Sequence, residues 1–141
     1  MIKARLRFVS LICVLLVLLP GLRIQAHHSF GAEYDGNKPI TLKGVVTKVD
    51  WANPHCHFYM DVTDGAGKTN WKFEGFPANV LARTGFKKDE TLKVGDTITV
   101  FAWRARDGSA LAHARELTFA DGKRLFFGPP AGTGEGNPVA K

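Results

Sequence analysis

Apolar and polar residues alternate along most of the chain, a pattern typical of β-strands with one buried face. The clearest case is segment 55–62, in which Cys56 to Val62 place apolar side chains on one face while His55 and His57 lie on the other. Turn residues separate the alternating segments. The pattern predicts strands over 40–51, 55–62, 69–74, 97–104, 113–119 and 125–127.

One segment departs from this alternation. Residues 77–84 begin with Pro77 and are followed by Gly85, the usual order at the two ends of a helix, and Val80 and Leu81 would pack it on the sheet. Three strands, a helix and two strands is the order of an OB-fold. We therefore expect a mainly β protein, a small OB-like five-stranded barrel with one short helix between strands three and four. An open sandwich of the same strands is the alternative.

The first 26 residues have the composition of an export signal. Basic residues precede the apolar segment 8–19, which Pro20 ends. As a helix this segment would cover about 18 Å, well short of a hydrocarbon core of about 30 Å. It therefore predicts a signal peptide over 1–26 that is cleaved after Ala26, and an uncleaved anchor is the alternative. The mature protein is expected to be exported, without membrane attachment after cleavage.

The rest of the chain divides into three expected parts. An N-terminal arm over 27–38 precedes the OB-like domain over 39–127, and residues 128–141 are expected to be a disordered tail because they are mostly Gly, Pro and small polar residues. With the signal removed, Cys56 is the one remaining cysteine, so no intramolecular disulfide can form, and the alternation predicts a thiol in the core.

The net charge and the absence of catalytic motifs argue against two classes of function. The net charge is +6, but four of the 19 Lys and Arg residues lie in the signal, which leaves 15 basic against 13 acidic side chains in the mature chain. This small excess argues against a nucleic-acid partner. Motifs such as G-x-S-x-G, H-E-x-x-H and C-x-x-C are absent from the sequence, so we expect a binding protein rather than an enzyme.

The histidines are the candidate metal ligands. Cleavage after Ala26 would make His27 the terminus, where its α-amine and ring can chelate one ion, an arrangement that favours Cu(II). If Ala26 is retained, His28 becomes the third residue of a different copper-binding terminus. His55 and His57 share one face of a strand and can approach one ion. The alternatives are that these histidines are solvated or cap turns, or that they sense pH or hydrogen-bond an organic ligand.

Other residues could support or replace a metal site. Glu74 could orient an imidazole, or it could be a surface carboxylate at a strand end. Trp51, Tyr59, Trp71 and Trp103 could form an aromatic binding platform, or they could pack in the core. The second functional hypothesis is a metal-free OB-fold interaction module that binds a peptide, a glycan or a partner protein.

Several spaced motifs agree in order with one protein family. They are His27-His28-Ser29-Phe30, Trp51-x-Asn53-Pro54-His55, Glu74-Gly75 and Pro77-x-Asn79-x-Leu81-x-Arg83-x-Gly85-Phe86. The mature chain resembles small exported proteobacterial proteins that form a family of unknown function. The resemblance implies a periplasmic or secreted single domain from a Gram-negative bacterium, and no established activity. Cys56 and His57 depart from the apolar or aromatic residues typical of that family, which leaves His55 as the stronger ligand candidate.

Overall fold

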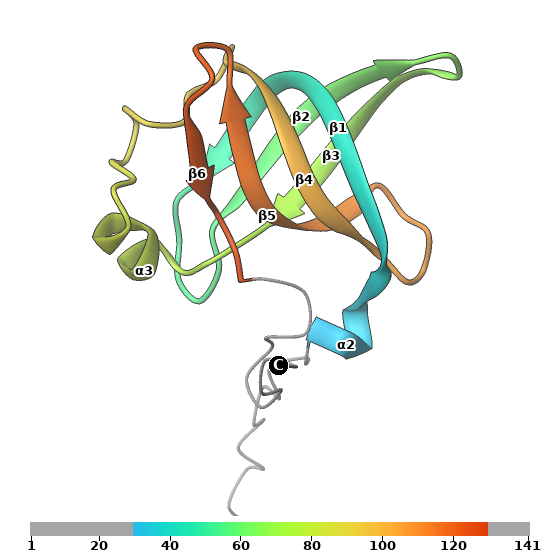
Figure 1. The fold of residues 1–141 in the computed structure, drawn as a ribbon, viewed down its shortest axis with the longest axis horizontal. Coiled ribbons are helices and arrows are strands. Elements are labelled where there is room, and N and C mark those ends of the chain that lie inside the picture. The colour runs from blue at the N-terminus through green and yellow to red at the C-terminus, as the bar shows by residue number, and fades with distance from the viewer. Residues whose placement is uncertain (1–29, 130–141) are drawn as a thin grey trace, which may run out of the picture.

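The computed structural model describes residues 30–129, which form a mainly β structure (Figure 1). Within this part of the chain, six strands belong to one sheet and two short helices accompany them. No helix in the described range is long and apolar enough to cross a membrane. The predicted signal peptide lies outside that range. The elements are α2 (Phe30–Glu33), β1 (Tyr34–Asp50), β2 (His57–Asp64), β3 (Gly67–Glu74), α3 (Ala78–Arg83), β4 (Thr97–Ala105), β5 (Leu111–Phe119) and β6 (Arg124–Phe126).

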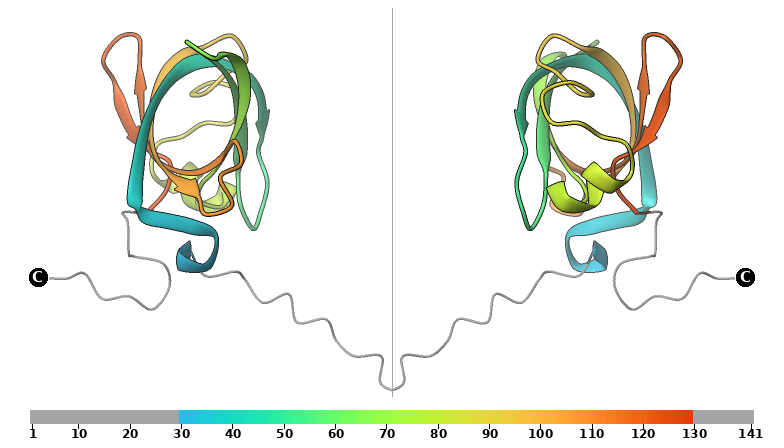
Figure 2. Two further views of the ribbon diagram at one scale, coloured as in Figure 1. Left: turned by 90° about the vertical axis from the view of Figure 1, so that its right-hand side faces the viewer. Right: turned by 90° about the vertical axis from the view of Figure 1, so that its left-hand side faces the viewer.

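Five of the strands close into a ring, which Figure 2 shows from two sides. β1 pairs with both β2 and β4, β2 pairs with β3, and β4 pairs with β5. A short parallel pairing between β3 and β5 completes the circle, and the other pairings are antiparallel. β6 adds to β5 outside the ring. The mainly β prediction and the helix between strands three and four are confirmed.

The length and curvature of β1 allow it to serve two neighbours. Its first part pairs with β4 and its last part pairs with β2, and the change of partner falls near Gly44. A Cβ at Gly44 would collide with the Asp61 carbonyl and the Met60 side chain, so only glycine permits this close approach. Because it bends at this point, β1 can pair with β2 on one side of the ring and with β4 on the other.

Alternation along the strands fills the interior with apolar side chains. Cys56, Phe58 and Phe73 are fully buried, and the rings of Phe58 and Phe73 stack with 4.8 Å between centroids. The predicted core thiol is therefore confirmed. Leu81 attaches α3 to this core, whereas Val80, the other residue expected to do so, stays half-buried.

A second, smaller apolar cluster lies at the start of β1. It contains Tyr34, Trp103 and Ala105, with Phe30 and Leu111 packed against them. β1 therefore begins at Tyr34, six residues before the strand start that alternation predicts. The sequence signal is weak there because the pairing with β4 is irregular between Tyr34 and Pro39.

Candidate functional site

Three polar side chains form a row across the outer face of neighbouring strands. His57 on β2 pairs with Glu74 on β3, and Glu74 pairs with His113 on β5. Their sequence neighbours, among them Phe58, Phe73 and Ala112, are fully buried in the core, so the row faces outward. Register thus brings together residues from three separate strands.

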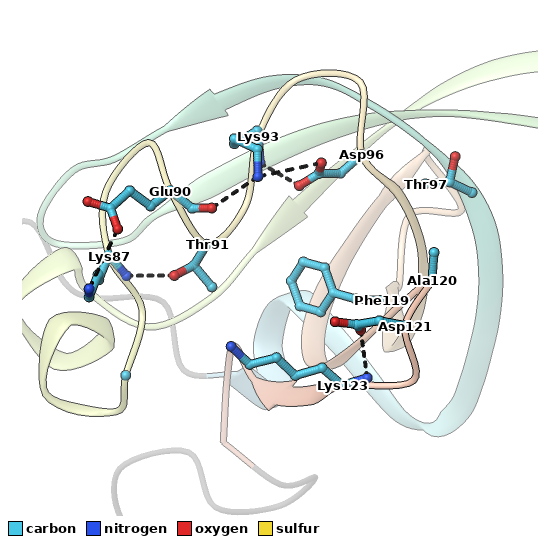
Figure 3. Close-up of a pocket in the computed structure, with 11 residues that line it drawn as sticks. Lys87, Glu90, Thr91, Lys93, Asp96, Thr97, Phe119, Ala120, Asp121 and Lys123 are labelled. Carbon is cyan, nitrogen blue, oxygen red and sulfur yellow. Dashed lines mark hydrogen bonds and ion pairs between the residues drawn. The ribbon is translucent and has the colours of Figure 1, made fainter.

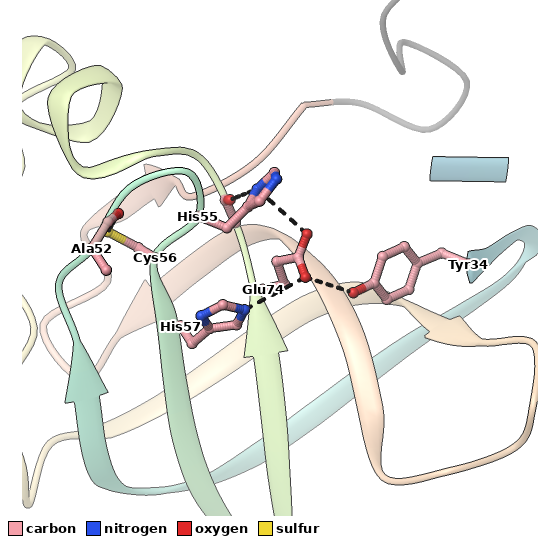
Figure 4. A network of polar contacts seen from close by, with 7 residues as sticks. Tyr34, Ala52, His55, Cys56, His57 and Glu74 are labelled. Atoms are coloured by element: carbon pink, nitrogen blue, oxygen red, sulfur yellow. Dashed lines mark hydrogen bonds and ion pairs between the residues drawn. The ribbon is translucent and has the colours of Figure 1, made fainter. Parts of the chain in front are cut away.

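Glu74 is the centre of a polar network that Figure 4 shows. The Tyr34 hydroxyl donates a hydrogen bond to Glu74 Oε2 at 3.1 Å. His57 Nε2 lies 3.5 Å from the same oxygen, and His55 Nδ1 lies 3.4 Å from Oε1. We call these four residues, together with His113, the Glu74 cluster.

The cluster keeps Glu74 ionised. Partial burial alone would raise the pKa of the Glu74 carboxyl, but the hydrogen bond from His57, the neighbouring His55 and His113, and the Tyr34 hydroxyl together lower the pKa to about 2. Burial and the adjacent Glu74 charge raise the pKa of Tyr34, so its hydroxyl remains a donor. A negative charge is therefore fixed beside the imidazoles at neutral pH.

His55 is held in a defined orientation by the end of β3. Its Nδ1 atom lies 3.1 Å from the Gly75 carbonyl oxygen, which can only accept, so Nδ1 is the donor in this contact. Backbone hydrogen bonds from Cys56 to Phe76 and from Gly75 to Cys56 fix the two segments relative to each other. Metal-bound imidazoles are commonly oriented by such a carbonyl or carboxylate at the other ring nitrogen.

His113 is the buried member of the cluster. It is 6% exposed, and the rings of Phe30 and Tyr34 meet it edge-on at 5.3 and 5.2 Å between centroids. Among the described residues its Nδ1 atom has no hydrogen-bond partner. Burial, opposed by the Glu74 charge and assisted by His55, lowers the pKa of His113 to about 4, so the ring is neutral at physiological pH.

Sequence reasoning misses two members of the Glu74 cluster. Tyr34 falls in a segment whose pattern predicts no strand, and His113 appears as an isolated residue at a strand start. The available signal is that Ala112 and Ala114 alternate with His113, which places the imidazole on the outer face. The parallel pairing of β3 with β5, which makes His113 a neighbour of Glu74, leaves no trace in the pattern.

The aromatic residues of the predicted platform have different packing partners in the structure. Trp51 packs on Phe86 at 6.5 Å, and Lys48 lies over the Tyr59 ring at 5.0 Å. Trp71 stacks beside Phe73, and Trp103 belongs to the small cluster with Tyr34. Each aromatic side chain thus has its own packing partner. His27 and His28 lie outside the described residues.

Within residues 30–129, no group of three His, Cys, Asp or Glu side chains is arranged to hold a metal ion. A metal that used His55 would therefore need a donor from elsewhere in the chain or from solvent. Both sulfur side chains in the described range, Cys56 and Met60, are fully buried and cannot supply it without unfolding.

A cleft of about 520 Å³ lies apart from the Glu74 cluster (Figure 3). The loop that follows α3 and the β5–β6 turn line it with charged side chains. Lys87 pairs with Glu90, and Lys93 pairs with Asp96. None of the predicted site residues that the structure describes lines this cleft.

Comparison with known proteins identifies one family, and the matched residues include the whole Glu74 cluster. No curated protein and no solved structure matches the chain. A family model described as a family of unknown function, DUF6152, matches residues 16–114, a range that includes every member of the Glu74 cluster. The expected membership of a family of unknown function is thus confirmed, and the chain belongs to DUF6152.

Proposed function

We propose that this protein is a small exported binding protein that holds one copper ion, as Cu(II), between the mature N-terminal His27 and His55. His28 would take part in place of His27 if Ala26 is retained. Glu74 and His57 would orient His55 rather than bind the ion, because His57 Nε2 already faces the Glu74 carboxylate. The protein would store, deliver or sense the ion in the periplasm or outside the cell.

The orientation of His55 is the observation that carries the proposal. Gly75 and Glu74 both contact Nδ1, so Nε2 is the ring atom through which a neutral His55 would bind a metal. The His55 side chain is 37% exposed, which leaves the ring accessible. A histidine that only capped a turn would need the Gly75 contact but not the buried carboxylate beside it.

The path of the chain supports the second ligand. The Phe30 ring contacts His113, which is the register neighbour of Glu74. Connectivity limits the Cα of residue 28 to about 7 Å from that of Phe30, and the Cα of residue 27 to about 11 Å. The length of this segment therefore permits the α-amine and imidazole of residue 27 to approach the Glu74 cluster, as the proposal requires.

The donor set favours Cu(II) over Cu(I). The proposed ligands are amine and imidazole nitrogens, which suit Cu(II), whereas Cu(I) prefers thiolate and thioether sulfur. Cys56 and Met60 are fully buried in the core, so their sulfur atoms are not accessible to Cu(I). The site would therefore bind oxidised copper and lose affinity when the ion is reduced.

The strand order supports an OB-like barrel as the scaffold. Pairing of β1 with β2 and β4, of β5 with β3 and β4, and a helix between β3 and β4 is the arrangement expected for that fold. The Glu74 cluster lies on the outside of this ring, where OB-like proteins have room for a ligand.

A Cu(II) titration of protein that begins at His27 tests the proposed function. We expect one ion per chain, and at least tenfold weaker binding for His55→Gln, because one imidazole ligand is lost. Acetylation of the N-terminus should weaken binding as strongly. Asn70→Asp, a change on the outer face of β3 away from the cluster, should leave the affinity unchanged.

Two results would contradict the proposal. Undiminished binding after acetylation would discard the N-terminal ligand. Absence of stoichiometric binding would discard the copper site altogether and favour the metal-free interaction module that recognises a peptide, a glycan or a protein.

A further inference from the structure

The cleft shown in Figure 3 is large enough for a small ligand. Its volume of about 520 Å³ lies within the range of about 300–1,000 Å³ that small-molecule sites occupy. One wall is the loop between α3 and β4, residues 84–96, and the other is the β5–β6 turn, residues 120–123. Phe119, at the end of β5, lies between the two walls. We call this space the charged cleft, and none of its lining residues belongs to the Glu74 cluster.

The loop that forms the first wall is held by its own hydrogen bonds. The Lys87 N–H donates to Thr91 Oγ1 at 2.8 Å. The Lys93 N–H donates to Asp96 Oδ2, also at 2.8 Å. The Asp96 carbonyl accepts a hydrogen bond from the Val46 N–H at 2.9 Å, which attaches the loop to β1. Because these bonds order the wall, a ligand would not have to order it on binding.

The turn that forms the second wall is fixed in a similar way. Asp121 Oδ1 accepts a hydrogen bond from the Lys123 N–H at 2.9 Å. The Phe119 N–H donates to the Lys123 carbonyl at the same distance. Within the described residues, the Lys123 ammonium makes no hydrogen bond or ion pair, and Figure 3 shows its side chain extending from the turn towards the loop. The second wall therefore offers a donor that is available to a ligand.

The formal charges around the charged cleft cancel. Three lysines and three acidic residues line it, namely Lys87, Lys93, Lys123, Glu90, Asp96 and Asp121. On the loop, Lys87 Nζ lies 3.6 Å from Glu90 Oε2. Lys93 Nζ lies 3.9 Å from Asp96 Oδ1. A ligand with a net charge would be attracted by one set of groups and repelled by the other, so this balance favours a neutral ligand.

The paired charges keep unused hydrogen-bonding capacity. An ammonium has three protons and an ionised carboxylate has about four lone-pair sites, so one ion pair leaves most of them open. Lys93 Nζ, for example, also donates to the Glu90 carbonyl at 3.1 Å. Hydroxyl groups can donate to the carboxylates and accept from the ammonium groups without breaking the pairs. A neutral ligand with many hydroxyl groups would use both kinds of capacity.

Phe119 supplies an apolar surface in the same cleft. Its ring is half-buried and packs against the core, which holds it in place between the walls. A sugar ring carries hydroxyl groups around its edge and C–H groups on its faces, and the C–H groups can pack on an aromatic ring. The fixed ring of Phe119 and the balanced donors and acceptors together match this distribution of polar and apolar groups.

We propose that the charged cleft binds a neutral saccharide. One face of a sugar ring lies on Phe119, and its hydroxyl groups contact the Lys123 ammonium and the paired charges of the loop. This site is separate from the proposed copper site and does not depend on it.

Changes in amide chemical shifts, measured by NMR on protein that begins at His27, test the proposal. The neutral probes are glucose, galactose, maltose and cellobiose, and the charged probes are glucuronate and glucosamine. At about 50 mM, a probe with a Kd of about 1 mM would occupy nearly every site. We expect the neutral sugars to shift the amides of residues 87–97 and 119–123. The two charged sugars should bind more weakly than glucose.

Lys123→Met and Lys88→Met form a matched pair. Both lysines are exposed, but Lys88 does not line the charged cleft. Lys123→Met keeps an apolar side chain and removes the ammonium, so affinity for the neutral sugars should fall about three- to tenfold with the loss of its hydrogen bonds. Lys88→Met should bind them as the wild type does.

Phe119→Ala tests the aromatic surface. Affinity for the neutral sugars should fall at least about fivefold, because the ring on which the sugar packs is removed. Phe126→Ala is the control, since the exposed Phe126 ring lies outside the charged cleft. Phe119 also packs on the core, so urea denaturation is measured on each variant. If Phe119→Ala does not fold, the lysine pair decides the result.

Three results would overturn the proposal. They are absence of shifts at the cleft amides with every neutral sugar, a stronger response to glucuronate or glucosamine than to glucose, and equal affinities of Lys123→Met and Lys88→Met. His55→Gln should bind the sugars as the wild type does. Failure of the saccharide site and failure of the copper site are therefore separate results.

Discussion

At the scale of single residues, Glu74 accounts for the organisation of the cluster. Its carboxylate contacts His55 and His57, which are two residues apart, and also Tyr34, which is 40 residues away from Glu74 in the sequence. A carboxylate that is only 17% exposed would be costly if these partners were absent. Its burial is therefore compensated by groups that it in turn orients.

Glu74→Gln tests that role. The amide keeps the shape but removes the charge, so we expect the free energy of unfolding to fall by about 1–3 kcal/mol, since hydrogen bonds to a charged group are lost. Copper affinity should fall about 10- to 100-fold, as when the partner that orients a ligand is removed. Glu116→Gln, which removes an equally buried carboxylate paired with Arg124, should leave copper binding unchanged, and a parallel loss in both variants would contradict the role of Glu74.

His113 gives the protein a pH-dependent stability. The folded pKa of about 4 lies below the ordinary value of 6.5, so the unfolded chain binds the extra proton first as pH falls. Stability is full above pH 6.5 and is lost as pH falls through the range from 6.5 to 4, by on the order of 3 kcal/mol. Glu74, with a folded pKa of about 2 against 4.5, adds a further loss between pH 4.5 and 2.

Urea denaturation across pH measures this dependence. Replacement of the buried imidazole by a ring that cannot titrate, His113→Phe, should flatten the curve between pH 6.5 and 4 and leave the drop below pH 4.5 in place. A wild-type curve that is already flat from pH 6.5 to 4 would mean that His113 is not held neutral by the Phe30 and Tyr34 rings.

At the scale of elements, the segment after β6 packs against the residues that follow β3. The Phe127 carbonyl accepts a hydrogen bond from the Phe76 backbone, and its buried ring lies directly against Gly75. A Cβ at Gly75 would overlap that ring, so the passage of the chain from β3 towards α3 depends on glycine at this position.

Gly75→Ala should therefore destabilise the fold by about 1–3 kcal/mol, the usual cost of overpacking, as measured by chemical denaturation. Gly65→Ala is the matched control, because no atom lies within 4 Å of a Cβ at that position. Similar stability of the two variants would show that the Phe127 ring moves aside without cost.

Element prediction from sequence succeeds where one face of a strand is buried. Alternation locates β2 to β6 to within a few residues, because Cys56, Phe58 and similar residues must face the core. It fails at the first residues of β1, where Tyr34 packs outside the ring in the small aromatic cluster. It also cannot choose partners, so the contact of β3 with β5 emerges only from the closed ring.

The same limit applies to the candidate site. His55 and Glu74 can be singled out from residue type and from their positions at strand ends, and the structure brings them together. Tyr34 and His113 cannot, because their roles depend on which strands become neighbours. Long-range pairing is a property of the whole core and not of any local pattern.

At the scale of the whole molecule, ring closure places two distant segments at one location. β1 begins where β3 ends, so the Tyr34 hydroxyl reaches Glu74 across 40 positions of the sequence. Phe30 of α2, which packs on Tyr34, and the imidazole of His55, which contacts Glu74, thereby lie at the same side of the ring. The proposed copper site depends on this proximity.

The nitrogen coupling of bound Cu(II), measured by pulsed electron paramagnetic resonance on protein that begins at His27, tests this account most directly. The wild type should show imidazole nitrogens from two residues, and His55→Gln should lose one of them while the α-amine coupling persists. Identical spectra for the two proteins would contradict the account, because the strand-borne imidazole would then have no part in holding the ion.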